Sequence, residues 1–158
     1  MSRLILMIGI PGCGKSTLTQ KLLVKHPKIL LISTDKIRYQ LFGDEAIQGS
    51  WLQIWQEIKT LFQYAVIHKL TTIYDATNAK SNQRKNAIAL AREIGFNQII
   101  GIWVNTPLSV CLERNQKRDR QVREEIILGM YQQLTDAPPS KADGLDRVII
   151  LNSKKEEG

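Results

Sequence analysis

The chain has 158 residues, of which 43% are apolar and 23% are charged. These proportions suit one folded domain with a single core and exclude a wholly disordered chain. The apolar runs are strand-sized, far short of the roughly 18 residues that a membrane span needs, so we expect a cytoplasmic protein without a membrane segment. The net charge of +7 favours anionic ligands, from nucleotides to nucleic acids.

Five apolar runs alternate with helical patterns along the chain. The predicted strands are residues 4–8, 29–32, 71–74, 98–104 and 148–151. The predicted helices are residues 16–25, 51–65, 82–94 and 126–134. This alternation predicts a three-layer α/β/α domain with a five-stranded, mostly parallel sheet and right-handed connections. We expect Ser81 to be the N-cap of the third helix, one domain over residues 1–151, and a frayed tail over residues 152–158.

Two tryptophans, Trp51 and Trp55, lie in the predicted helix over residues 51–65. They belong to an apolar stripe at helical spacing, which favours a face packed in the core. An aromatic pair can instead stack on a nucleic-acid base. The stretch before this helix contains Asp44 and Glu45 and is either a loop that moves over the acceptor or a solvated connection.

Residues 9–16 match the pattern G-x-x-x-x-G-K-S, the Walker A or P-loop motif, between a predicted strand and a predicted helix. The glycines let the backbone approach phosphate oxygens, and successive N–H groups with the helix start form an anion nest. Lys15 places its charge on the β- and γ-phosphates, and the Ser16 hydroxyl ligates magnesium. The motif therefore predicts ATP with Mg²⁺ as the cofactor. The residues expected to bind it are Gly9, Pro11, Gly12, Cys13, Gly14, Lys15, Ser16 and Thr17.

The two cysteines, Cys13 and Cys111, are too few for a disulfide framework. No cysteine and histidine pattern has the spacing of a zinc site. Cys13 lies near a predicted helix start, where the thiolate is favoured. We expect two reduced thiols.

The run STDKIR follows the second predicted strand, at the edge where ligands bind in an open parallel sheet. Asp35 can accept a proton there from an attacking hydroxyl group. Arg38 follows one helical turn later and can hold an anionic group of the substrate. Thr34 or Asp35 can also serve as a helix N-cap, a role that is compatible with catalysis.

The run DATN ends the third predicted strand. Asp75 either holds a water molecule bound to magnesium or positions the acceptor. The side chains of Thr77 and Asn78 can then form hydrogen bonds with the substrate. An ordinary polar strand end is the alternative interpretation.

The basic run ERNQKRDR lies before the last predicted helix. Arg114 and Arg118 are four residues apart, so a helix places both on one face. Paired guanidinium groups suit a short lid that closes over the phosphates. The alternative is a solvated basic face.

Together, IGIPGCGKST, ISTDKIR, DATN and WVNTP…CLERNQKR resemble the kinase domain of phage-type polynucleotide kinases and small bacterial AAA-type ATP-binding kinases. The motifs occur in the family's order and cover residues 1–150. The resemblance implies a P-loop NTPase fold like that of nucleoside and nucleotide kinases. It implies transfer of the γ-phosphoryl group to the 5′-hydroxyl of DNA or RNA.

The same resemblance implies a role for each matching residue. Lys15 and Ser16 bind ATP and magnesium, and Asp35 is the general base. Arg38 contacts the phosphate of the acceptor strand, and Asp75 supports the acceptor end. Arg118 bridges to the donor phosphate with Arg114 nearby. The chain carries Lys36 where some relatives have a second acidic residue, and it stops before a phosphatase domain, so we expect no phosphatase activity.

Two other functions fit the residues. Relatives of similar pattern phosphorylate nucleosides, sugars, antibiotics or aminoacyl-tRNA, so a small hydroxyl compound is an alternative acceptor. A non-catalytic ATP-binding module that signals through a partner is the second alternative, with Asp35 acting only as a cap. The sequence specifies no oligomeric state.

Overall fold

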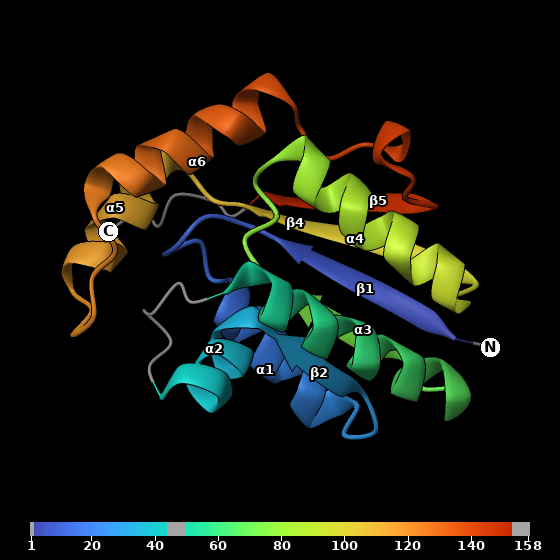
Figure 1. The fold of residues 1–158 in the computed structure, drawn as a ribbon. Coiled ribbons are helices and arrows are strands. Elements are labelled where there is room, and N and C mark those ends of the chain that lie inside the picture. Colours follow the sequence, from blue (N-terminus) through green and yellow to red (C-terminus); the bar gives the residue numbers. More distant parts are fainter. Residues whose placement is uncertain (1, 44–49, 153–158) are drawn as a thin grey trace.

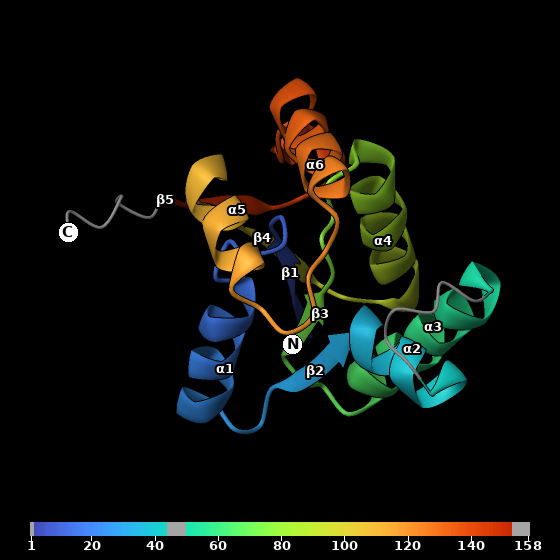
Figure 2. The ribbon, with the colours of Figure 1, turned by 90° about the vertical axis from the view of Figure 1, so that its left-hand side faces the viewer.

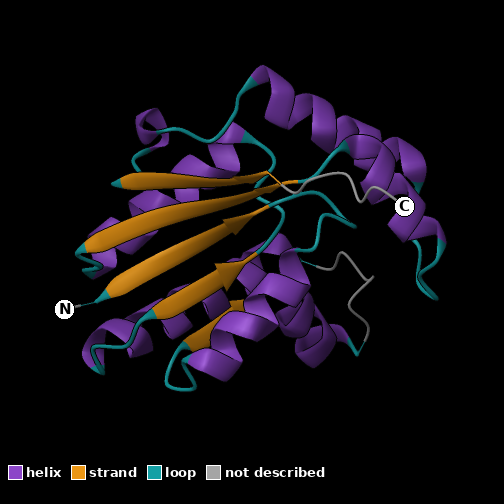
Figure 3. Ribbon diagram, turned by 180° about the vertical axis from the view of Figure 1, so that it is seen from behind, coloured by secondary structure: helices purple, strands orange, loops and turns teal. Residues whose placement is uncertain are grey.

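The structure, a computed structural model, describes residues 2–43 and 50–152 (Figure 1). Five strands form one sheet in the order β2-β3-β1-β4-β5. They are β1 (Arg3–Ile8), β2 (Leu30–Ser33), β3 (Thr72–Asp75), β4 (Gln98–Asn105) and β5 (Arg147–Asn152). Every pairing is parallel, so the carboxyl ends of all five strands meet at one edge of the sheet (Figure 3). The predicted α/β fold is confirmed, with a wholly parallel sheet rather than a mostly parallel one.

Helices cover both faces of this sheet. They are α1 (Lys15–Lys25), α2 (Thr34–Phe42), α3 (Trp51–Ile67), α4 (Ser81–Ile94), α5 (Leu108–Gln116) and α6 (Glu124–Asp136), with the 3-10 helix η1 (Lys141–Asp143) before β5. Figure 2 shows α1 and α5 on one side of the sheet and α3 and α4 on the other. None of the helices in the described ranges is both long and apolar enough to cross a membrane.

The apolar stripe on α3 packs in the core, as predicted, at its aliphatic and phenylalanine positions. Ile54, Ile58 and Phe62 are fully buried. The Phe62 ring meets the ring of Tyr74 edge to face, with centroids 5.8 Å apart. Trp51 differs, because it lies at the start of the helix with 49% of its surface exposed.

Helices α2 and α5 are absent from the predicted helix ranges, although the spacings at Asp35 and Arg114 assumed a local helix, and the N-caps of α2 and α4 differ from expectation. The N-cap of α2 is Ser33, whose Oγ accepts a hydrogen bond from the Lys36 N–H, so neither Thr34 nor Asp35 caps it. The N-cap of α4 is Lys80 without a side-chain bond, and the Ser81 hydroxyl instead contacts Asp143 at 3.5 Å.

The predicted tail begins one residue too early. Asn152 belongs to β5, and its Oδ1 accepts a hydrogen bond from Nδ2 of Asn105 at 3.0 Å. The rest of that tail, and the predicted loop residues Asp44 and Glu45, lie outside the described residues.

Candidate active site

Residues 9–14 turn from the end of β1 into α1 at the carboxyl edge of the sheet. Gly12 and Gly14 have φ angles of +84° and +97°, in the left-handed region that glycine adopts without a side-chain clash. Because Gly14 is the N-cap of α1, no cap side chain covers the N–H groups of the first helical turn. Helix starts of this kind favour anions. We call residues 9–16 the phosphate loop.

The phosphate loop is packed against the start of α5. A Cβ atom on Gly12 would lie 2.4 Å from the carbonyl oxygen of Cys111, so this position has room only for glycine. The buried hydroxyl of Thr106, after β4, donates to the carbonyl of Cys13 at 2.6 Å. Nη1 of Arg114 donates to the carbonyl of Gly12 at 3.4 Å. Contacts from the β4–α5 segment therefore fix the path of the loop.

Both cysteines are buried free thiols, as expected for reduced residues. Burial raises the pKa of Cys13, and this effect exceeds the lowering by the Lys15 backbone N–H and charge. Burial likewise raises the pKa of Cys111 to about 11. At Cys13, desolvation therefore outweighs the effect of the helix start on the thiol.

Lys15 and Asp75, both predicted site residues, contact each other directly. Nζ of Lys15 lies 2.5 Å from Oδ1 of Asp75, and each side chain is 15% exposed. The β1–β3 register pairs Met7 with Asp75, which brings the carboxylate level with the end of β1. The cation expected to bind phosphate and the acid expected to act at the metal therefore form one ion pair in this structure.

The donor set expected to serve magnesium is the Ser16 hydroxyl and the Asp75 carboxylate. Both are hard oxygen ligands of the type that magnesium prefers. Within residues 2–43 and 50–152, no cluster of three or more histidine, cysteine, aspartate or glutamate side chains could hold a metal alone. The residues therefore fit an ion that is held jointly with phosphate oxygens and water.

Asp35 and Arg38 lie at the carboxyl end of β2, on α2. The Asp35 side chain is 67% exposed, and its Oδ1 lies 3.2 Å from Nη1 of Arg38. The Arg38 side chain is only 19% exposed, and its Nε atom is buried without a hydrogen-bond acceptor in the described part of the chain. An unpaired buried donor costs roughly 1–3 kcal/mol, so an anion that reached Nε would remove that cost.

The DATN segment is tied to β1 by its own backbone and by Asn78. The Gly9 N–H donates to the carbonyl of Thr77 at 3.1 Å. Asn78 is buried in the left-handed conformation with φ of +51°, and its Nδ2 donates to the carbonyl of Met7 at 2.8 Å. The expected substrate contact by the Asn78 amide is therefore not supported, because the amide holds the loop together. Thr77 is half-buried and lines a cleft.

The two lid arginines do not share a helix face, contrary to the prediction. Helix α5 ends at Gln116, and Arg118 follows in a turn where its N–H donates to the carbonyl of Asn115. The Asn115 side chain forms two hydrogen bonds with the backbone of Val122, at 2.7 and 3.0 Å, and so closes this turn. Arg114 reaches the phosphate loop, whereas Arg118 is exposed on the turn.

Arg84 is a buried residue of α4 that the sequence reasoning missed. Its Nε atom lies 2.8 Å from Oδ2 of Asp143, and the side chain is 0% exposed. Its Nη atoms donate to the carbonyls of Asn78, Ala79 and Ala137. Arg84 shares the inward spacing of Ala87 and Ala91 on the predicted helix, and that signal could have identified it.

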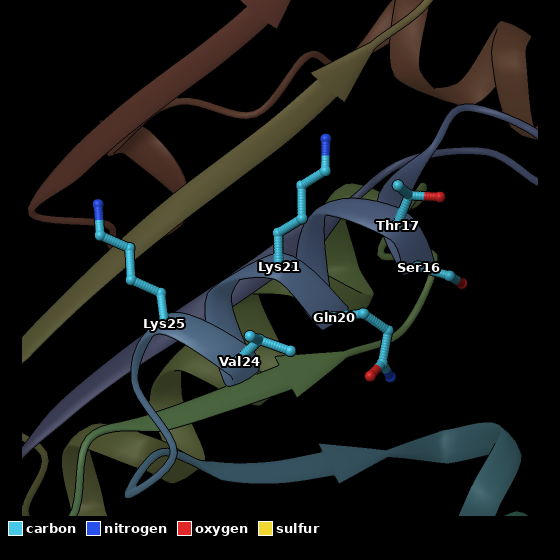
Figure 4. Close-up of a pocket in the computed structure, with 6 residues that line it drawn as sticks. All are labelled: Ser16, Thr17, Gln20, Lys21, Val24 and Lys25. Atoms are coloured by element: carbon cyan, nitrogen blue, oxygen red, sulfur yellow. The ribbon is translucent and has the colours of Figure 1, made fainter.

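A shallow hollow of about 580 Å³ runs along α1 beside the phosphate loop (Figure 4). Its lining residues are Ser16, Thr17, Gln20, Lys21, Val24 and Lys25. Figure 4 shows Lys21 and Lys25 extending to the same side of the helix. The surface next to the loop is therefore rich in positive charge.

A family model described as an AAA domain matches residues 4–137. The chain belongs to this AAA domain family. This match, together with the similarity to curated kinases, confirms the resemblance to P-loop kinases that was drawn from the motifs.

The relatives of this AAA domain include kinases of different substrates. L-seryl-tRNA(Sec) kinase from Methanococcus maripaludis is 28% identical over 147 residues, which cover 87% of this chain and 54% of the relative. Adenylyl-sulfate kinase from Aeromonas salmonicida is 28% identical over 117 residues, which cover 69% of this chain and 57% of the relative. The chain thus spans little more than half the length of these curated relatives.

The fold of the AAA domain also matches solved structures. A chain in the structure of the Pnkp1/Rnl/Hen1 RNA repair complex superposes with a TM-score of 0.77 at 18% identity, over 85% of this chain and 44% of that chain. At this identity the match shows the shared fold.

Proposed function

We propose that this domain transfers the γ-phosphoryl group of ATP to a hydroxyl group, and that the hydroxyl is the 5′ end of a polynucleotide. The observation that carries the proposal is the pairing of an exposed carboxylate, Asp35, with the half-buried guanidinium of Arg38. A base that faces solvent suits a chain end better than an enclosed small molecule. The buried, unpaired Nε of Arg38 offers a donor for an acceptor phosphate.

In the proposed donor half, the phosphate loop and the start of α1 hold the ATP phosphates. Lys15 leaves Asp75 and pairs with the β- and γ-phosphate oxygens. Magnesium, when bound with ATP, neutralises charge on those oxygens. Ser16 and Asp75 are the residues that would hold it, directly or through water.

In the proposed acceptor half, Asp35 accepts the proton of the attacking hydroxyl as its oxygen bonds to the γ-phosphorus. The bond from that phosphorus to the bridging oxygen breaks, and ADP leaves. Arg118, on the turn after α5, shares the charge of the transferring group, while Arg114 of α5 contacts the phosphate loop.

The comparisons support this proposal without naming the acceptor. The similarity to a kinase of seryl-tRNA supports a hydroxyl carried on a nucleic acid. The similarity to adenylyl-sulfate kinase favours a second candidate function, phosphorylation of a small hydroxyl compound.

The test is transfer of label from γ-labelled ATP with magnesium to 5′-hydroxyl DNA and RNA with single-stranded, blunt and recessed ends. Nucleosides, sugars and adenylyl sulfate serve as the competing acceptors. We expect transfer to an oligonucleotide; label that enters only a small acceptor would establish the second candidate.

A second experiment tests the general base. Asp35→Asn should lower kcat by roughly 10²- to 10⁴-fold with ATP binding intact, and Lys36→Gln, its exposed neighbour, is the control. Unchanged turnover in Asp35→Asn would remove Asp35 as the base.

A further inference from the structure

A second cleft lies beside the phosphate loop, between α4 and α6, and has a volume of about 340 Å³. Figure 2 shows these two helices side by side. The cleft is lined by Thr77, Ala79, Lys80, Gln83, Glu125, Ile126, Gly129, Met130 and Gln133. Apart from Thr77, none of these residues belongs to the motifs that define the kinase site.

One end of the cleft is formed by Thr77 of the DATN segment, a residue predicted to contact the acceptor. Thr77 follows Asp75 by two residues, and its carbonyl is bonded to the N–H of Gly9 in the phosphate loop. A ligand in the cleft therefore lies against the same segment that carries Asp75. This position suits a part of the acceptor that extends away from the reacting hydroxyl.

Arg84 forms hydrogen bonds with the backbone on both sides of the cleft. It donates to the carbonyls of Asn78 and Ala79 in one wall. It also donates to the carbonyl of Ala137 at the end of α6, the other wall. Its ion pair with Asp143 is buried, so these contacts are part of the core. The cleft is accordingly preformed, and binding there does not require the walls to be ordered first.

The lining combines an apolar surface with amide groups and two charged side chains, Lys80 and Glu125. Ile126 and Met130 lie on successive turns of α6, and Gly129 between them leaves open space where a side chain would stand. Gln83 and Gln133 each offer a donor and an acceptor, a combination that reads the edge of a base. Lys80 supplies a cation of the kind that contacts phosphate.

We propose that the α4–α6 cleft binds a nucleobase of the acceptor strand near its 5′ end. The base packs on Ile126 and Met130, the two glutamine amides meet its edge, and Lys80 lies toward a flanking phosphate. This inference rests on the proposed function, because it deepens the description of the same acceptor. A sugar acceptor carries no base to fill this cleft, whereas a nucleoside acceptor does.

The test fills the cleft from α6. Gly129→Leu places a side chain where a Cβ meets no atom within 4 Å, so the helix tolerates it. Gln132→Leu adds the same side chain on the same helix outside the cleft and is the matched control. We expect Gly129→Leu to raise the KM for a 5′-hydroxyl oligonucleotide about tenfold, the order of one lost apolar contact. The KM for ATP should not change, and Gln132→Leu should behave like the wild type.

Oligonucleotides with one abasic site at each of the first three nucleotides test the base itself. An abasic site at one of these positions should lower the kcat/KM of the wild type about tenfold. The same abasic site should leave the kcat/KM of Gly129→Leu almost unchanged. Equal kcat/KM for intact and abasic acceptors, or an unchanged KM in Gly129→Leu, overturns the cleft proposal.

Binding measurements separate this proposal from the proposed function. Fluorescence anisotropy of a labelled 5′-hydroxyl oligonucleotide, without ATP, reports occupancy of the cleft whether or not transfer occurs. Weaker binding to Gly129→Leu than to Gln132→Leu, together with no transfer by the wild type, would reject the kinase acceptor and retain the base site. Equal binding to the two variants would reject the base site even if transfer is found.

Discussion

The ammonium group of Lys15 lies 2.5 Å from the carboxylate of Asp75, in a pair that is only 15% exposed on each side. The two residues form an ion pair at the phosphate loop, and each is also expected to serve the nucleotide. In the proposed function, binding of ATP exchanges this ion pair for contacts with phosphate and metal. The loss of one partner should change how ATP binding depends on magnesium.

Magnesium should increase the affinity for ATP in the wild type, and Asp75→Asn is expected to lose most of that increase. The affinity for ATP with magnesium should fall by about 10- to 100-fold, the range for loss of a group that orients the ligands of a metal. Binding in EDTA should be as tight as in the wild type or tighter, because Lys15 no longer has to leave a carboxylate. Calorimetric titration with ATP, with and without magnesium, measures both effects. Asp35→Asn is the control, and an equal magnesium effect in the wild type and Asp75→Asn would contradict this role.

Arg118→Ala is expected to lower kcat by roughly 10³-fold with little effect on the KM for ATP, because a lid arginine acts on charge in the transition state. Lys117→Ala removes the neighbouring exposed cation, which pairs with Glu113, and should leave kcat nearly unchanged. Steady-state kinetics on the preferred acceptor compares the two. Similar small effects in both variants would indicate a solvated basic face.

Arg84→Met is expected to destabilise the domain by about 3–5 kcal/mol, because it leaves Asp143 buried without its partner. Three backbone carbonyls lose a donor as well. Lys85→Met, at the next and exposed position of α4, should change the free energy of unfolding by less than about 0.5 kcal/mol. Urea unfolding measures both variants, and equal midpoints would show that the buried pair contributes little.

Asp146 supplies a stabilisation that depends on pH. The Ile99 N–H and the Arg92 guanidinium, both bonded to its carboxylate, lower the pKa of Asp146 below its ordinary value of 3.8. The stabilisation is therefore complete above that value and disappears as pH falls through the lower folded-state pKa. Asp146→Asn should be less stable than the wild type at pH 7, and the two should converge in acid. Urea unfolding across pH tests this, with Asp136→Asn as an exposed control; a constant difference would exclude the linkage.

The sequence predicted the elements whose signal is local. The five strands appear as apolar runs, and α3 as a stripe led by Ile54 and Ile58. Helices α2 and α5 span only nine residues each, and the end of α5 belongs to a basic run, so neither shows a long apolar stripe. Both helices nevertheless place predicted site residues, Asp35 on α2 and Arg114 on α5.

Contacts between distant segments could not be read from the chain alone. The Lys15–Asp75 pair depends on the β1–β3 register. The structural role of Asn78 depends on the hydrogen bond from its Nδ2 to the carbonyl of Met7. The Arg84 side chain forms hydrogen bonds with Asp143 and Ala137, each more than 50 residues away in the sequence. In each case the residue type was informative, but its partner is set by the packing of the sheet and helices.

The contact between Gly12 and α5 has a consequence for how this protein can vary. The atom that excludes a side chain at Gly12 is the backbone carbonyl of Cys111, which every amino acid at that position presents alike. No exchange at position 111 can therefore make room for alanine at position 12. Among homologues, the two positions should show no correlated substitution, and a suppressor of Gly12→Ala would have to displace the axis of α5 itself.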